Sequence, residues 1–418
     1  MIVYKFGGAS VKDANGIRNL SEIVSKETEN LVIVVSAFGK TTNALERLLK
    51  AWYAGETSYR TELSEIRTYH FTVADELLGD ESEGKKRLAA SFDSLSDKLN
   101  IAARGEYDHD YDMIVSMGEI WSTMVVEAYL RERGRESRWI DIRKLLLTDD
   151  RYRDANILWP ESTTRIRETF SFKDNGIYVT QGFIGCTSEG ETTTLGREGS
   201  DYTAAILGNI LDAERVVVWK DVPGIMSADP KWIEGAETIR DLSYNEAVEM
   251  TFSGAKVIHP KTIKPLHNKN IPMHVRSFID HDEKGTVISS AVAEGRRVPV
   301  FIKKENQILV SILPKDLSFV MGENLAGVFH YFEQCGVKVN MVQAGAVSID
   351  VCADDERPRI ETVKRELGKE YKILYNEGVE MLTIRHYQPG SENLITRDAE
   401  ILISQRTRTS ARFVVRRK

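Results

Sequence analysis

Glycines, hydroxyl side chains and one arginine are concentrated in residues 178–203, YVTQGFIGCTSEGETTTLGREGSDYT. The apolar run at 177–180 indicates a strand, and the alanine-rich run after Asp201 indicates a helix. Small residues let a ligand approach the backbone, and a helix N-terminus attracts an anion. Arg197 adds a guanidinium suited to a carboxylate or phosphate. The segment predicts an anion-binding strand–loop–helix unit; the alternative is an ordinary connection with Ser200 or Asp201 as the helix cap.

A second candidate for anion binding, a lysine near the end of a strand, lies at the start of the chain. Lys5 stands near the end of a predicted strand at 2–6 and is followed by Gly7 and Gly8, so its ammonium can reach phosphate oxygens beside backbone N–H groups. The alternative is a surface lysine before a turn. A second strand, 31–35, runs into a hydroxyl-rich segment that contains Gly-Lys-Thr. This is not a Walker A loop, because the first glycine of that motif would be Val34, inside the strand.

Acidic side chains form two further candidates. Asp108, His109, Asp110 and Asp112 are of the types that bind metals, but we interpret them as a solvated turn. Glu119 falls in the first turn of a predicted helix at 120–133, on the side of the strand ends. The alternative for Glu119 is a favourable interaction with the helix dipole.

Strands that alternate with helices as far as residue 280 predict a three-layer α/β domain with a mostly parallel sheet. Fully apolar runs such as 31–35 are typical of strands buried on both faces. After a composition shift at 291–297, the order βαββα is typical of a small ferredoxin-like domain. Its strands are expected at 308–312, 337–342 and 346–351, with helices at 325–334 and 357–370. Further strands are expected at 381–384, 400–404 and 411–415, with no convincing helix between the first two.

Length and composition limit the possible functions. A chain of 418 residues exceeds the roughly 250–300 residues of a single core, so two or three domains are expected. The balance of 56 basic and 63 acidic residues, a formal charge of −7, argues against nucleic acid as a main partner. Three widely spaced cysteines, the absence of a membrane-length apolar run and an N-terminus that enters a strand directly predict a cytoplasmic protein.

Six motifs together resemble the aspartate kinases, of the amino acid kinase superfamily with C-terminal ACT domains. They are KFGGAS at 5–10, SAFGKTTN at 36–43, Gly118 with Glu119, GREGSD at 196–201, the segment 221–230 and SGAKVIHP at 253–260. Their order and spacing fit the family over nearly the whole chain, and they favour aspartate over glutamate, carbamate or nucleotide monophosphate as acceptor. The resemblance implies an amino acid kinase domain at 1–292, a first ACT-like domain at 300–370 and a second, shortened one at 371–418.

The resemblance also implies a reaction: ATP and L-aspartate give 4-phospho-L-aspartate, the first step towards lysine, threonine and methionine. Lys5 would stabilise the transition state, with Asp201 orienting it, while Glu119 receives the substrate ammonium and Arg197 a carboxylate. Mg²⁺ is expected with ATP, held by phosphate oxygens and water, and no protein metal ligand is assigned. The implied catalytic set is Lys5, Asp201 and Lys256; the nucleotide-binding set is Lys5, Gly7, Gly8, Ser10, Lys220, Asp221, Met226, Lys231 and Lys256; the aspartate-binding set is Ser36, Thr42, Glu119, Arg197, Gly199 and Ser200.

Several positions differ from the family pattern. Ala9 replaces a threonine, Glu198 a glycine, Lys220 a threonine and Met226 a tyrosine. Residues 342–345, VQAG, stand where hydroxyl-bearing residues usually help to hold an inhibitory amino acid, so feedback by lysine or threonine stays open. A homodimer through the ACT sheets is expected. Two alternatives also stay open, an amino-acid sensor with little turnover and a kinase for another carboxylate acceptor.

Overall fold

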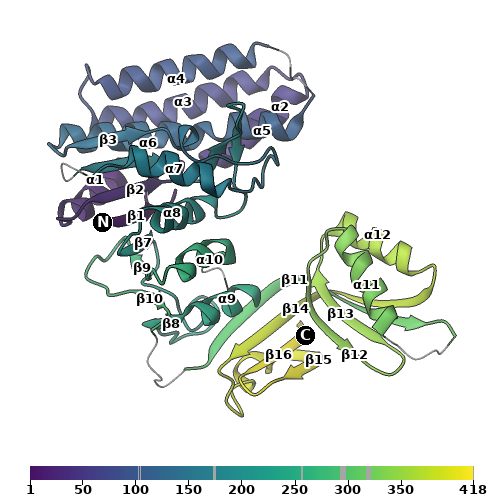
Figure 1. The fold of residues 1–418 in the computed structure, drawn as a ribbon. Helices are drawn as coiled ribbons and strands as arrows, with labels where there is room; N and C mark the ends of the chain where they lie inside the picture. Colours follow the sequence, from purple (N-terminus) through teal and green to yellow (C-terminus); the bar gives the residue numbers. More distant parts are fainter. Residues whose placement is uncertain are drawn as a thin grey trace. The chain divides into compact units, whose positions relative to one another are not determined.

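The computed structural model describes residues 1–101, 103, 105–172, 176–255, 258–291, 298–316 and 322–417 (Figure 1). The described chain divides into two compact units. The first comprises 1–225, 238–247 and 258–292, and the second 226–237, 248–257 and 293–418. Lys256 and most of the predicted linker lie outside the described residues.

The first unit is built on a mostly parallel sheet, as the sequence predicts. Its described strands follow the order β3-β4-β2-β1-β7-β9-β10-β8, parallel from β3 to β9, with β10 antiparallel to β9. β1 and β2 are wholly buried, which agrees with their apolar sequences. The strand bounds are β1 Ile2–Phe6, β2 Leu31–Val35, β3 Ser137–Ile140, β4 Ile177–Gln181, β7 Arg215–Lys220, β8 Asp241–Ser243, β9 Met273–Ser277 and β10 Thr286–Ser289.

Helices cover this sheet. In α1, the residues Ile17, Leu20, Ile23 and Val24 recur at helical spacing and are buried, and the Asp13 side chain caps the helix by accepting from the Gly16 N–H. α6 packs on β2, β3 and β4, and α8 packs on β1 and β7. α3 and α4 form a further layer against α6 (Figure 1). The helix bounds are α1 Ala14–Ser25, α2 Thr41–Tyr53, α3 Ser58–Leu77, α4 Glu83–Leu99, α5 Tyr107–Val115, α6 Met117–Glu132, η1 Ile142–Lys144, α7 Trp159–Thr169, α8 Gly199–Ile210, α9 Tyr244–Phe252 and α10 Pro260–Asn268.

The glycine- and threonine-rich segment contains more regular structure than expected. Between β4 and α8 it forms an antiparallel hairpin of β5 (Ile184–Cys186) and β6 (Thr192–Thr194). The turn has Gly190 at φ +91°, a left-handed backbone that glycine adopts without strain, and the three threonines are β-branched and suit a strand. α8 begins at Gly199 rather than at Asp201, and Glu198 before it is left-handed, with φ 56°.

The acidic group at 108–112 is not a solvated turn, so that interpretation was wrong. It lies in α5, where His109, Asp110 and Asp112 are buried. The Asp112 carboxylate accepts from Thr194, through its N–H and its hydroxyl, each at 2.7 Å, and from the Arg153 N–H at 3.0 Å. Burial is possible because these partners, distant in sequence, satisfy the charge.

The second unit is an antiparallel sheet, with the described strands in the order β12-β13-β11-β14-β16-β15. β11 and β14, fifteen residues each, pair with each other across both ACT-like segments, so the two segments share one sheet. α11 and α12 supply Val328, Phe332 and Ile360 to the core beside β11 and β13. The bounds are β11 Val300–Pro314, α11 Gly322–Gln334, β12 Val339–Ala344, β13 Ile349–Asp354, α12 Arg357–Leu367, β14 Tyr371–Arg385, α13 Asn393–Thr396, β15 Ala399–Arg406 and β16 Ser410–Arg417.

The described residues between β14 and β15 form one short helix, the four-residue α13, where the sequence showed no convincing helix. The domain boundaries themselves stay a prediction. In the part of the chain that the structure describes, none of the helices is both long enough and apolar enough to cross a bilayer.

Candidate active site

A cavity of about 560 Å³ lies at the carboxyl ends of the parallel strands of the first unit. Lys5 comes from the end of β1, Ser36 directly follows β2, and Lys220 ends β7. β1 lies between β2 and β7 in the sheet. The strands that follow β1 in the chain are first added on the β2 side and later, from β7 on, on the other side of β1. Open α/β sheets bind their ligands at such a change of direction.

Ten of the residues singled out from the sequence line this one cavity. They are Lys5, Gly8, Ser36, Thr42, Glu119, Arg197, Gly199, Ser200, Asp201 and Lys220. Gly7 and Ser10 form the adjoining turn, in which the Ser10 N–H donates to the Gly7 carbonyl at 3.0 Å, and Asp221 is exposed just after β7. Met226 and Lys231 belong to the second unit, and Lys256 lies outside the described residues. The roles of all these residues stay predictions.

The closest charge pair in the cavity joins β1 to α8. Lys5 Nζ lies 2.6 Å from Asp201 Oδ1, and Lys220 Nζ lies 3.6 Å from Asp201 Oδ2. Both Lys5 and Asp201 are buried. Burial by itself raises the pKa of Asp201, but the two lysines overcome it and hold the pKa below its ordinary value. Asp201 is therefore a carboxylate that fixes the ammonium of Lys5 at the rim of the sheet.

Close backbone approach explains one glycine of the first motif. A side chain on Gly8 would place its Cβ 2.6 Å from the Ala37 carbonyl oxygen, and the Gly39 N–H donates to the Gly8 carbonyl at 3.0 Å. The loops after β1 and β2 therefore touch through their main chains. Only glycine allows this contact beside Lys5.

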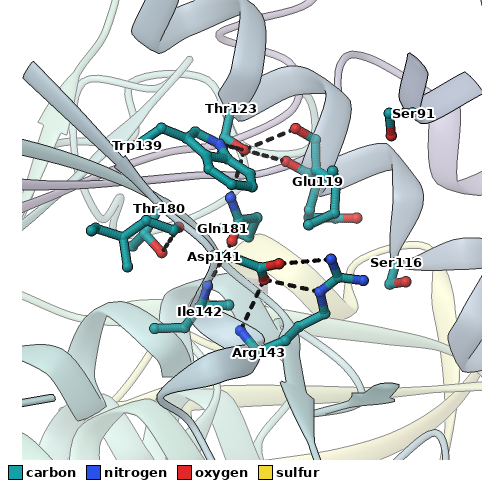
Figure 2. Close-up of polar contacts among 12 residues, drawn as sticks. Ser91, Ser116, Glu119, Thr123, Trp139, Asp141, Ile142, Arg143, Thr180 and Gln181 are labelled. Atoms are coloured by element: carbon teal, nitrogen blue, oxygen red, sulfur yellow. Dashed lines mark hydrogen bonds and ion pairs between the residues drawn. The ribbon is translucent and has the colours of Figure 1, made fainter. Parts of the chain in front are cut away.

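Glu119 is held in the cavity by a buried polar network (Figure 2). Its backbone carbonyl accepts from the Thr123 hydroxyl at 2.8 Å. Thr123 in turn accepts from Gln181 Nε2 at 2.8 Å and from Trp139 Nε1 at 2.9 Å, and Gln181 Oε1 accepts from the Ile142 N–H at 2.9 Å. The network ties the first turn of α6 to β3, β4 and η1. The position of Glu119 is thereby fixed by two strands of the sheet and by the short helix η1.

The side chain of Glu119 is only partly satisfied. Oε1 accepts from the Ala37 N–H at 3.3 Å, whereas Oε2 is buried without a hydrogen-bond partner among the described residues. Burial raises the pKa of Glu119 to about 8, against the opposing effects of the Ala37 N–H and the charge of Lys5. A buried carboxylate with a free oxygen is suited to a cationic ligand group, which restores its charged form.

Three further residues line the cavity that the sequence did not single out, Tyr111, Arg153 and Phe183; Thr194, one of the hydroxyl residues of the segment 178–203, lines it too. The guanidinium carbon of Arg153 lies 4.4 Å from the centre of the Tyr111 ring, and the backbone N–H of Arg153 donates to the Asp112 carboxylate. Its φ of 68° is unusual for a residue other than glycine, and the sequence carries no signal for it. Arg153 therefore adds a cation to the same cavity as Arg197.

Glu198 also lines the cavity, at the position where the family usually has glycine. Its left-handed backbone, φ 56°, explains why glycine suits this position. Its Oε2 is buried without a partner among the described residues, as is Oε2 of Glu119. The cavity thus offers two carboxylate oxygens to a cation.

Comparison with known proteins agrees with this geometry. The model of the amino acid kinase family matches residues 1–277. The chain is 32% identical over 361 residues to lysine-sensitive aspartokinase 3 of Escherichia coli, covering 85% of this chain and 78% of that protein. It is 33% identical over 375 residues to the chloroplastic aspartokinase 3 of Arabidopsis thaliana, covering 85% of this chain and 65% of that protein. It spans 42% of a bifunctional aspartokinase/homoserine dehydrogenase from the same plant.

The fold leads to the same group of proteins. The crystal structure of E. coli aspartokinase III in complex with aspartate and ADP matches with a TM-score of 0.84 and 28% identity, over 99% of this chain and 96% of that one. The structure of the same enzyme in complex with lysine and aspartate matches with a TM-score of 0.82. By sequence and by fold, the chain belongs to the aspartokinases of the amino acid kinase family.

Proposed function

We infer that this chain, an aspartokinase by sequence and fold, transfers the γ-phosphoryl group of ATP to the β-carboxylate of L-aspartate. One observation supports this most strongly. A single cavity at the carboxyl ends of the strands holds the buried Lys5–Asp201 pair beside Glu119, whose Oε2 has no partner among the described residues. The cavity therefore offers a fixed cation for a phosphoryl group and an anion for an amino acid.

The acceptor is already a carboxylate, so no general base is needed. A β-carboxylate oxygen forms the new bond to the γ-phosphorus, the bond from phosphorus to the β,γ-bridging oxygen breaks, and ADP leaves with the electron pair. Catalysis then depends on alignment and on stabilising negative charge on the transferring group. Lys5 serves the second purpose, because Asp201 fixes its ammonium before the substrates bind. The N–H groups of Gly8 and the start of α8 add donors at the same rim.

Aspartate has one ammonium and two carboxylates, and the cavity offers groups of matching charge. Glu119 receives the ammonium on Oε2, and Arg197 receives the α-carboxylate. Ser36, Thr42 and Ser200 complete the pocket with hydroxyl groups. Arg153 also lines the cavity and is a second candidate for a carboxylate, which would compete with Asp108 for its guanidinium, now 3.0 Å from the Asp108 carboxylate.

We propose that ATP binds next to Lys5, with Lys220 and Asp221 along the nucleotide. Nucleotide-binding roles for Met226, Lys231 and Lys256 rest on the family resemblance alone. Mg²⁺ bound together with ATP would shield the phosphate charge. Asp201, the carboxylate beside the phosphate lysines, already pairs with both Lys5 and Lys220, so we propose that phosphate oxygens and water, rather than this side chain, would hold the metal.

We further propose a homodimer through the ACT-like sheet and an amino-acid effector, lysine or threonine. The support is the ACT-like sheet itself and the lysine complex of the E. coli enzyme. A cytoplasmic location fits the three cysteines, all of which are free. Melting curves with lysine, threonine and methionine test the effector, since a ligand that binds only the folded state raises the melting temperature. No shift with any of them would exclude control by these amino acids.

A hydroxamate assay tests the proposed reaction. Acyl phosphate formed from ATP is trapped with hydroxylamine, with aspartate, glutamate or succinate as the acceptor. We expect product from aspartate and little from succinate, which lacks the ammonium that Glu119 binds. Product from succinate at the same rate would contradict the pocket assignment. No product from any acceptor would favour an amino-acid sensor on the same scaffold.

A further inference from the structure

A second cavity, of about 220 Å³, lies on the other face of the strands that carry the active-site lysines. Tyr4 and Trp219 line this rear cavity, and each directly precedes a lysine, Lys5 or Lys220, that lines the active site. Successive side chains of a strand point to opposite faces, so the sheet separates the two cavities. Ile23 of α1 and Lys26, the residue directly after this helix, form another wall of the rear cavity.

Three residues of the rear cavity carry nitrogen atoms that lack a hydrogen-bond partner among the described residues. They are Nε1 of Trp219, Nε of Arg276 and Nε2 of His281. Trp219 is only 3% exposed. The tryptophan and arginine nitrogens can only donate, and buried donors in folded proteins nearly always have an acceptor. The rear cavity therefore calls for a ligand with acceptor atoms.

These donors are fixed in place by one another. The Arg276 guanidinium carbon lies 5.1 Å from the centre of the Trp219 ring, and a terminal nitrogen of Arg276 donates to the His281 carbonyl at 2.7 Å. The His281 ring meets Trp219 edge-on, with 6.1 Å between the ring centres. A ligand would bind to donors that are already ordered, which lowers the entropic cost of binding.

The charges around the rear cavity are mainly positive. Lys26, Arg215 and Arg276 line it, against the carboxylates of Glu27 and Asp282. Glu27 is already engaged, since it accepts from the Tyr4 hydroxyl at 2.7 Å and lies 3.5 Å from Arg215. A cationic ligand would have to displace the partners of Glu27 or bind to Asp282 alone, whereas an anion would find the unused donors of Trp219 and Arg276.

We propose that the rear cavity binds a small oxyanion of the phosphate or carboxylate class, through Trp219, Arg276 and His281. Its volume admits a small molecule and excludes a nucleotide. The carboxylate and phosphate sources share two or more acceptor oxygens on one centre, which suits the planar guanidinium. This proposal is independent of the reaction in the other cavity. If water alone fills the cavity, the proposal is wrong.

Fluorine NMR of the full chain labelled with 5-fluorotryptophan tests it. The sequence has six tryptophans, so the labelled protein gives six signals, and Trp219→Phe identifies the one that matters. Inorganic phosphate, succinate and chloride are titrated at equal ionic strength, with saturating Mg·ADP and aspartate to occupy the active site. We expect the Trp219 signal to move saturably with phosphate or succinate, whichever is the better ligand, and not with chloride.

Two variants keep the test decisive. Arg276→Gln should abolish the shift while the other signals keep their positions. Lys26→Gln changes an exposed side chain directly after α1 and should weaken the binding several-fold without disturbing the core. A Trp219 signal that stays unmoved by both oxyanions up to tens of millimolar, or that moves equally with chloride, would overturn the proposal. So would binding unaffected by both variants.

Discussion

The two cavities on either face of β1 and β7 differ in the kind of atom that lacks a partner. Among the described residues, the active-site oxygens with neither a hydrogen bond nor an ion pair include Oε2 of Glu119 and of Glu198. In the rear cavity, the buried side-chain atoms without a hydrogen bond in the described part of the chain are nitrogens of Trp219, Arg276 and His281. Lys220 and Trp219, neighbours in β7, thus line cavities whose unpartnered atoms differ, acceptors in the first and mainly donors in the second. This contrast is the basis of our two proposals, that the active site receives a cationic group in addition to phosphate and that the rear cavity receives an anion.

The lysine cluster gives the largest expected effect. Lys5→Ala should reduce kcat about a thousandfold, because the interaction lost is made chiefly with the transferring phosphoryl group. The measurement is the steady-state rate at saturating ATP and aspartate. Since Lys5 also pairs with the buried Asp201, the melting temperature should be measured in parallel to show that the variant folds. Turnover within a few-fold of the native rate would exclude Lys5 from catalysis.

The free oxygen of Glu119 gives the next largest effect. Glu119→Gln should raise the KM for aspartate by roughly 30-fold or more, since one partner of a buried charge pair is lost. The KM for ATP should change by less than about twofold, because the interaction that is lost is made with aspartate and not with ATP. Glu198→Gln is the matched control at the other unpartnered oxygen. Equal changes in the two KM values would count against ammonium recognition by Glu119.

The pH dependence sharpens the same point. The pKa of Glu119 is about 8 in the unliganded cavity, so the residue is mostly protonated at pH 6 and must lose its proton to bind an ammonium. The KM for aspartate should therefore fall about tenfold per pH unit between pH 6 and 7 and level off above pH 8. Glu119→Gln should remove this dependence. A KM that is flat from pH 6 to 8 in the native enzyme would contradict a protonated Glu119.

Rising pH should improve aspartate binding but lower the stability of the folded protein, because the buried Glu119 then becomes charged. A carboxyl whose folded-state pKa is raised contributes less to stability as the pH rises from its unfolded value towards 8. The melting temperature of Glu119→Gln minus that of the native protein should therefore increase as the pH rises from 5 to 8. A constant difference across this range would show that the buried carboxylate carries no such cost.

The network behind Glu119 gives the smallest effect. Thr123→Val leaves the buried donors of Gln181 and Trp139 without their acceptor, at a cost of about 1–3 kcal/mol in stability. The first turn of α6 should loosen, and the KM for aspartate should rise several-fold. Ser122→Ala is the control, since the Ser122 hydroxyl donates only to the Glu119 carbonyl in the described structure. Equal effects of the two variants would show that the network does not position Glu119.

Much of the first unit could be predicted from local pattern. The strand at 31–35 is recognisable because it is wholly apolar, and the strand at 2–6 because its other residues are mostly apolar, so that Lys5 stands out near its end. The motifs then suggested which residues share a site, and the structure brings ten of them around one cavity. The family assignment from those motifs is confirmed by the comparisons.

The features that the sequence did not reveal depend on contacts between distant segments. Asp112 is buried because Thr194 and Arg153 supply its donors, and no local pattern predicts that pairing. The left-handed backbone of Arg153 places a second arginine in the cavity, although the sequence around it is ordinary. The rear cavity is also invisible in the sequence, because Trp219 and His281 are brought together only by the sheet and the loop after β9.

Acceptor discrimination by the native enzyme and by Glu119→Gln tests the central claim most directly. The measurement is kcat/KM for aspartate divided by kcat/KM for succinate, which differs from aspartate only in lacking the ammonium group. We predict a large ratio for the native enzyme that falls at least ~30-fold in Glu119→Gln, mainly through loss of activity with aspartate. A ratio that is the same in both enzymes would show that Glu119 does not bind the ammonium, and the assignment of this cavity to aspartate would fail.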